Sequence, residues 1–189
     1  MLNYEKINDE VLYTKDAITR IDSKDIDILK AKATGNTRKR VRLCTHPSSQ
    51  DALHEMLIVL GDESYVPPHK HPRKSESFHI IEGFLDVVIF DDVGTVKEVI
   101  PMAAPGSDLP FYYRLSGSFF HMPVPTSDVV VFHEITNGPF DQSETVFASW
   151  APSDKDAETV QAEYLRHLWM LKKKSFEGLK PIQANPERA

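Results

Sequence analysis

The 189-residue sequence has a single cysteine and no long apolar run. One thiol, that of Cys44, cannot form an internal disulfide and cannot by itself supply a thiolate metal site. A membrane-spanning helix needs ~20 consecutive apolar residues, and no stretch approaches that length. Charged residues also interrupt the first ten positions, where a secretory signal would have its apolar segment. The sequence therefore predicts a cytoplasmic protein with no membrane association.

Positive charge is also scarce. The 22 lysines and arginines are outnumbered by 28 aspartates and glutamates, which gives a net charge of −6 with histidine neutral. Nucleic-acid binding depends on cations that neutralise phosphates, so we expect no nucleic-acid partner. One local basic run, residues 38–42, is interpreted either as solvated surface at the start of a strand or as a local anion clamp.

Short β-type runs fill the middle of the chain. Clusters of Gly, Pro, Asp and Ser separate them, and seven or more short strands at such spacing are typical of a sandwich or barrel. The runs occupy residues 41–44, 54–60, 77–82, 84–90, 96–100, 111–115 and 128–136. We therefore divide the chain into an N-terminal arm with one helix (1–40), a β domain (41–153), a C-terminal helix (154–175) and an extended tail (176–189).

Two amphipathic helices are predicted outside the β domain. The helix in the arm has Ser23 as its cap and ends at Gly35. In the second helix, apolar side chains recur every three or four residues, at Val160, Tyr164, Leu168 and Leu171. Either the β domain or a second subunit can cover this stripe. We expect a homodimer, because twofold dimers are the commonest assemblies.

Four side chains have the types and spacing of metal ligands. In a strand, His69 and His71 point to the same side, about 6.6 Å apart, and can converge on one ion. Pro72 ends that strand and turns the chain, so that Glu76 returns at the start of the next one. His121 lies in a later strand that can face the first pair. Three imidazoles and a carboxylate suit Fe, Mn, Ni, Zn or Cu, and make Ca or Mg an unsuitable ion.

These residues also form a recognisable motif. The pattern HxH(x)4E(x)6G, the first motif of the cupin superfamily, is unbroken at His69, His71, Glu76 and Gly83. In the segment that matches the second motif, PxGxxH, the histidine is present as His121, whereas Ser116 and Ser118 occupy the proline and glycine positions. The chain resembles the cupin superfamily and, within it, the WbuC-type cupin-fold metalloproteins over residues 38–154.

The resemblance implies an all-β fold, a cupin jelly-roll β-barrel, here with an N-terminal helical arm and a C-terminal helix. It also implies one divalent transition metal in the mouth of the barrel. The group is often linked to surface-polysaccharide biosynthesis and has no established reaction.

Further candidates lie near the predicted metal ligands. Alternation along residues 128–136 puts His133 and Glu134 on opposite faces, so one of the two points inward. We expect His133 to be a general base or a partner of a ligand; a strand-end or subunit contact is the alternative. Tyr113 is a second candidate for proton transfer. Tyr112 and Arg114 are candidates for substrate binding, since an aromatic ring stacks on sugars and a guanidinium binds anions; core packing is the alternative for the tyrosines.

Three functions fit these residues. The first is a metal-dependent isomerase or epimerase that acts on a small molecule, a sugar, sugar nucleotide or sugar-derived carbonyl compound. The second is an Fe(II)-dependent dioxygenase with the same ligands. The third is a metallated ligand-binding module without turnover.

Overall fold

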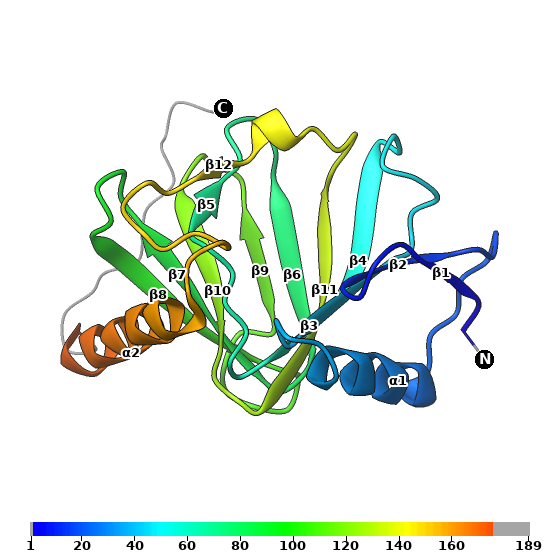
Figure 1. Cartoon of the computed structure of the whole chain (residues 1–189), viewed down its shortest axis with the longest axis horizontal. Helices are drawn as coiled ribbons and strands as arrows, with labels where there is room; N and C mark the ends of the chain where they lie inside the picture. The colour runs from blue at the N-terminus through cyan, green and yellow to red at the C-terminus, as the bar shows by residue number, and fades with distance from the viewer. Residues whose placement is uncertain (1, 176–189) are drawn as a thin grey trace.

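Two β-sheets form the body of the protein in the computed structural model, which describes residues 2–175 (Figure 1). The larger sheet has the order β1-β2-β3-β4-β11-β6-β9, and the smaller sheet has the order β12-β5-β10-β7-β8. The strands are β1 (Tyr4–Lys6), β2 (Val11–Thr14), β3 (Arg40–Cys44), β4 (Leu53–Gly61), β5 (His69–Lys70), β6 (Glu76–Glu82), β7 (Phe84–Phe90), β8 (Val96–Ala103), β9 (Tyr112–Leu115), β10 (Phe120–Pro125), β11 (Val129–Asn137) and β12 (Val146–Phe147).

The two sheets face each other across an apolar core. Leu60, Ile80 and Phe132 from the larger sheet pack there against Leu85 and Val87 from the smaller one. We call the faces that meet in this core the inner faces and the opposite ones the outer faces. This arrangement confirms the predicted all-β, jelly-roll type of fold.

The sheets do not close into a barrel, however, which differs from the barrel implied by the resemblance. β5 lies between β12 and β10 and has only two residues, His69 and Lys70. Prolines stand on both sides of it, at positions 67, 68 and 72, and proline cannot donate to a strand ladder. The short strand therefore joins its neighbours within the smaller sheet and does not bridge to the larger one.

Helix α1 (Ser23–Thr34) covers part of the outer face of the larger sheet. Its apolar side, with Ile26 and Leu29, packs on Val41 and Leu43 of β3. The N-cap is Asp22, one residue before the expected Ser23. The Asp22 carboxylate accepts from the backbone N–H of Asp25, and the Asp25 carboxylate accepts from that of Asp22.

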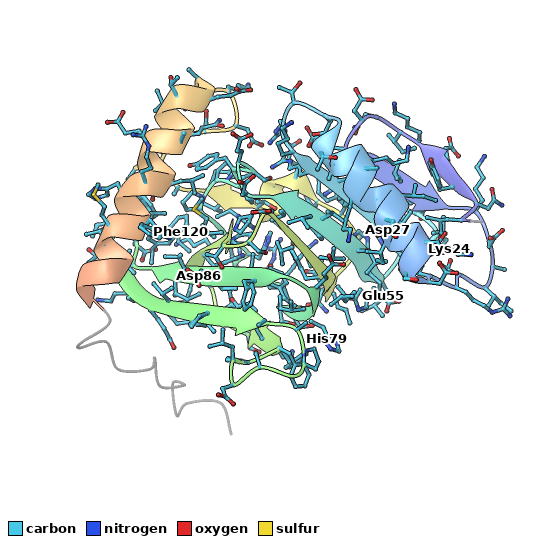
Figure 2. The ribbon with its side chains drawn as sticks, turned by 90° about the horizontal axis from the view of Figure 1, so that it is seen from below. Lys24, Asp27, Glu55, His79, Asp86 and Phe120 are labelled. Carbon is cyan, nitrogen blue, oxygen red and sulfur yellow. The ribbon has the colours of Figure 1, made fainter. Side chains whose placement is uncertain are left out.

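Helix α2 (Glu158–Ser175) covers the outer face of the smaller sheet, on the opposite side of the molecule from α1 (Figure 2). Tyr164, Leu165 and Leu168 pack near Phe90 and Trp150. The apolar stripe of this helix is therefore covered mainly by its own chain. The helix begins four residues after the expected start, and the expected extended tail, 176–189, lies outside the described residues. No helix in residues 2–175 is both long and apolar enough to cross a membrane.

The N-terminal arm also contributes two strands that the sequence analysis did not predict. β1 pairs with β2, and β2 pairs in parallel with β3, with Val11 beside Arg42. Both strands are very short, so their alternation gives little signal. They extend the larger sheet beyond β3.

Candidate metal centre

The four predicted ligands come together at one end of the space between the sheets. Their donor atoms all lie within 4.8 Å of one another. His69 is in β5 and His121 is directly opposite it in β10, while Glu76 begins β6 in the other sheet. His71 follows β5 in the turn that leads to Glu76. The structure thus gathers residues from both sheets, as the motif spacing predicts.

Each histidine has its Nδ1 atom against a backbone carbonyl oxygen. The distances are 2.9 Å from His69 to Pro67, 3.0 Å from His121 to Phe119 and 3.3 Å from His71 to Glu144. A hydrogen bond to a carbonyl requires the proton on Nδ1, which leaves the Nε2 lone pair free. Neutral imidazoles fixed in this tautomer are prepared to bind a metal through Nε2.

Two of the atoms that could bind a metal in this cluster lack a hydrogen-bond partner. They are Nε2 of His121 and Oε1 of Glu76, whose side chains are 0% and 3% exposed. They lie 3.0 Å apart, yet their orientation does not make a hydrogen bond. Buried polar atoms are normally satisfied. With His121 protonated the two atoms form an ion pair, and with His121 neutral both are free for a shared partner. Two ligands bound to one ion at ~2.1 Å and at right angles are about 3.0 Å apart, so the pair fits a shared metal.

Charge in the cluster is unevenly distributed. Burial, with His121 nearby, lowers the pKa of His69 to about 3, so this imidazole is neutral at physiological pH. Burial alone would raise the pKa of Glu76, but the neighbouring histidines outweigh it and the pKa is lowered. Glu76 is therefore an ionised carboxylate and His69 a neutral imidazole, the states in which these groups bind metals. Burial would lower the pKa of His121, but the Glu76 carboxylate outweighs it and this pKa is raised. His69 and His71 are only partly buried, so one side of the cluster is accessible.

The inner face of the larger sheet adds Glu134 and Tyr113 beside the cluster. Glu134 is paired with Phe78, whose ring lies in the core between the sheets, and Phe78 is paired with Tyr113. Directly opposed residues share a face, so all three point inward. The Tyr113 hydroxyl is buried without a hydrogen-bond partner. Its pKa is raised by burial and, to a lesser extent, by Glu76.

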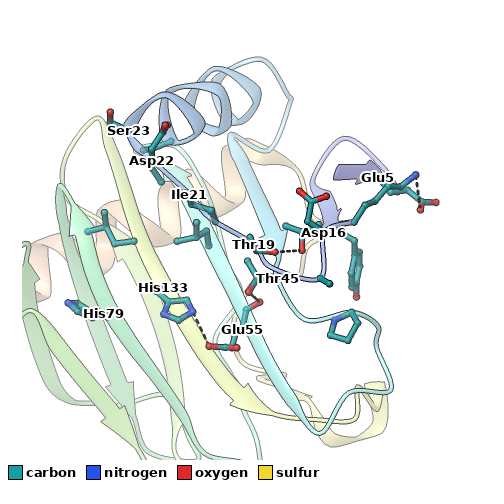
Figure 3. A pocket seen from close by; sticks show the side chains of 18 of the residues that line it. Glu5, Asp16, Thr19, Ile21, Asp22, Ser23, Thr45, Glu55, His79 and His133 are labelled. Atoms are coloured by element: carbon teal, nitrogen blue, oxygen red, sulfur yellow. Dashed lines mark hydrogen bonds and ion pairs between the residues drawn. The ribbon is translucent and has the colours of Figure 1, made fainter. Parts of the chain in front are cut away.

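His133 lies on the outer face, whereas the predicted ligands lie between the sheets. Figure 3 shows His133 beside Glu55 in a pocket on that face. His133 is paired there with His79, and its Nε2 atom is 3.9 Å from a carboxylate oxygen of Glu55. These residues line an outer groove of about 1720 Å³ between α1, the arm and the sheet. The expectation of a role for His133 beside the metal is therefore corrected: Glu134 is the inward member of the pair. Alternation could not choose between them, because both neighbours of this strand were unknown.

Tyr112 and Arg114, the predicted substrate-binding residues, also lie on the outer face. Tyr112 is paired with His79 and Arg114 with Ser77, and both are exposed. Arg114 donates to the Ser75 hydroxyl, 3.1 Å away, next to the start of β6. Neither side chain shares the inner face with the cluster, since each alternates with Tyr113 in β9.

Together, fold and site define a two-sheet, jelly-roll type β protein with a cluster of three histidines and one glutamate suited to a metal ion. A sequence model for a domain of unknown function, DUF6016, matches residues 21–102. No curated protein matches the chain.

Several solved structures share part of this fold. A protein of Shewanella oneidensis is 10% identical, with a TM-score of 0.46, over 73% of this chain and 80% of that one. The capsular polysaccharide assembling protein CapF of Staphylococcus aureus is 18% identical, with a TM-score of 0.47, over 59% and 32% of the two chains. Oxalate decarboxylase of Lactobacillus farciminis is 13% identical, with a TM-score of 0.41, over 51% and 27%. The chain thus spans about a third or less of the last two proteins.

Proposed function

We propose that this chain is a cupin metalloprotein that binds one divalent transition metal through His69, His71, Glu76 and His121. We further propose that it acts on a sugar or a sugar-derived carbonyl compound. The observation that carries the proposal is the convergence of the four motif residues, two of whose buried ligand atoms lie 3.0 Å apart and have no hydrogen-bond partner. The unbroken HxH(x)4E(x)6G motif supports it independently.

The donor set favours iron, manganese, nickel or zinc. Three imidazoles and one carboxylate form a mixed nitrogen and oxygen site, whereas Ca²⁺ and Mg²⁺ prefer oxygen ligands. When bound, such an ion supplies Lewis-acid chemistry toward a carbonyl oxygen.

The chain's own residues supply the proton chemistry. Burial, with Glu76 nearby, raises the pKa of Glu134 to about 7. A carboxyl with a pKa near neutrality can accept a proton from a substrate carbon and return it. Isomerisation or epimerisation requires that transfer at a carbon next to a carbonyl. Tyr113, with its buried hydroxyl, is the second inner-face group that can donate a hydrogen bond to a substrate.

The presence of Glu134 on the inner face also favours an enzyme over a metallated ligand-binding module. A pocket lined only by apolar groups would have no side chain to move a proton. A carboxyl in this position is costly to bury unless it has a partner or a function.

Elemental analysis of the purified protein tests the metal site. The wild-type chain is expected to contain about one equivalent of a transition metal, and the His69→Ala/His71→Ala variant to lose it. A matched control is His79→Ala/His133→Ala, which removes two imidazoles from the outer face of the larger sheet and is expected to keep the metal. Equal metal content in all three proteins would refute the site.

Glu134→Gln is expected to keep the metal and to lose at least tenfold in sugar turnover; unchanged turnover would refute the proton-transfer role.

A further inference from the structure

Arg42 points from β3 toward the inner side of the larger sheet. Its neighbours Val41 and Leu43 pack under α1 on the outer face, so alternation turns Arg42 the other way. The strand register agrees, because Arg42 is paired with Ile58, which packs against the core between the sheets. β3 lies toward the β1 edge of the larger sheet, separated from β11 by β4 alone. The Arg42 side chain is exposed.

The other cations of the same basic run are engaged by protein groups. Arg38 forms ion pairs with Glu10 and Asp154. Arg40 donates to Glu10 at 2.8 Å, and the Lys39 amine donates to the Thr34 carbonyl at 3.0 Å. Within the part of the chain that the structure describes, no hydrogen bond or ion pair engages the Arg42 guanidinium.

Arg42 also stands on the same face as the proposed reacting groups. Glu134 lies on that face two strands away, and its neighbour along the face, Thr136, is paired with Glu76. The positive charge of Arg42 acts on Glu134, but burial prevails and the pKa of Glu134 remains raised. Among the described residues, no ion pair joins the Glu134 carboxylate to the Arg42 guanidinium. From β3 toward β6, the inner face thus carries the guanidinium of Arg42, which has no ion-pair partner in residues 2–175, the carboxyl group of Glu134, and the predicted metal ligand Glu76.

We propose that Arg42 binds an anionic group of the substrate, which is therefore a sugar derivative with a carboxylate or a phosphate. A guanidinium offers a planar fork of donors that matches the oxygens of either group. The anion at Arg42 orients the substrate so that its oxygens face the cluster. This inference rests on the proposed function for the reacting end of the substrate, and on Arg42 alone for the charged end.

The test compares three matched probes by titration calorimetry: D-glucose, D-glucuronate and D-glucose 6-phosphate. The wild-type protein is expected to bind at least one charged probe tenfold or more tightly than glucose, and the better of the two identifies the anion as carboxylate or phosphate. Arg42→Ala is expected to reduce that affinity to the level of glucose. Arg42→Lys is expected to retain part of the preference, because it keeps the charge and loses the fork. Arg166→Ala, which removes an exposed arginine from α2, is the matched control and is expected to bind as wild type.

Two results would overturn the inference: equal binding of charged and neutral probes by the wild-type chain, including no binding of any, or an anion preference that survives in Arg42→Ala. Metal content is measured on the same samples. A chain without metal that still shows an Arg42-dependent preference would contradict the proposed function and support the inference. A metal-loaded chain that shows no preference for the charged probes would support the proposed metal site and contradict the inference about Arg42.

Discussion

Among single residues, His46 and His54 form a second pair of imidazoles near the cluster. Neither of them is a predicted metal ligand. Their rings are stacked, with centroids 4.1 Å apart and planes within 4°. Both side chains are buried, and Nε2 of His54 has no hydrogen-bond partner. Burial, with His46 nearby, lowers the pKa of His54 below 6.5. His54 is therefore packed as a neutral ring.

This packing predicts a contribution to pH-dependent stability. As the pH falls below 6.5, unfolded His54 binds a proton before folded His54 does, so the free energy of unfolding decreases. His54→Phe keeps an aromatic ring in the stack and removes the titration. Denaturant unfolding at pH 7.5 and pH 5 is expected to show a smaller loss of stability for His54→Phe than for wild type.

The control for that measurement is His167→Phe, which changes an exposed histidine of α2. It is expected to lose as much stability as wild type over the same pH interval. If His54→Phe loses as much stability as the wild type and the control, His54 does not contribute to the pH dependence of stability.

At the residue scale, the sequence predicted the ligand candidates and Tyr113 beside them, but it did not choose Glu134 over His133 or place Arg42. His69, His71 and Glu76 are close in sequence, so strand geometry and one proline turn suffice to bring them together. Glu134 and Arg42 are inner-face residues only because of how β11 and β3 pair with their neighbours. That register depends on contacts between distant segments, which alternation within one strand does not reveal.

Among the elements, α1 shows how one side chain fixes the start of a helix. The Asp22 carboxylate accepts from the backbone N–H of Lys24 at 2.8 Å and from that of Asp25, and the Asp25 carboxylate accepts from the backbone N–H of Asp22. The sequence analysis expected Ser23 as the cap, but aspartate caps as well as serine does, and Asp22 holds the position. The reciprocal bond from Asp25 falls three residues after Asp22, and this spacing selects Asp22.

The cap predicts a measurable stability change. Asp22→Ala removes the carboxylate oxygen that accepts two hydrogen bonds in the first turn and is expected to lower the free energy of unfolding by about 1 kcal/mol. Lys24→Ala, in the same turn, keeps the cap and is expected to change stability by less than about 0.5 kcal/mol. Chemical denaturation of both variants measures this difference, and equal losses would contradict the assignment of the cap.

At the scale of the whole molecule, two unequal sheets face each other, and each has a helix on its outer face (Figures 1 and 2). The all-β class followed from short runs and turn residues, but the open arrangement did not, because closure depends on pairing between strands far apart in sequence. The homodimer stays a prediction. α2 gives it little support, since Tyr164 and Leu168 pack on their own chain.

The central claim is that one metal ion is bound by residues of both sheets. Anomalous X-ray diffraction, at the absorption edge of the metal that co-purifies with the protein, tests it most directly. We expect a single peak within bonding distance of Nε2 of His69, His71 and His121 and of the Glu76 carboxylate. A peak elsewhere, such as beside His79 and His133 in the outer groove, or four side chains with no metal among them, would contradict the account.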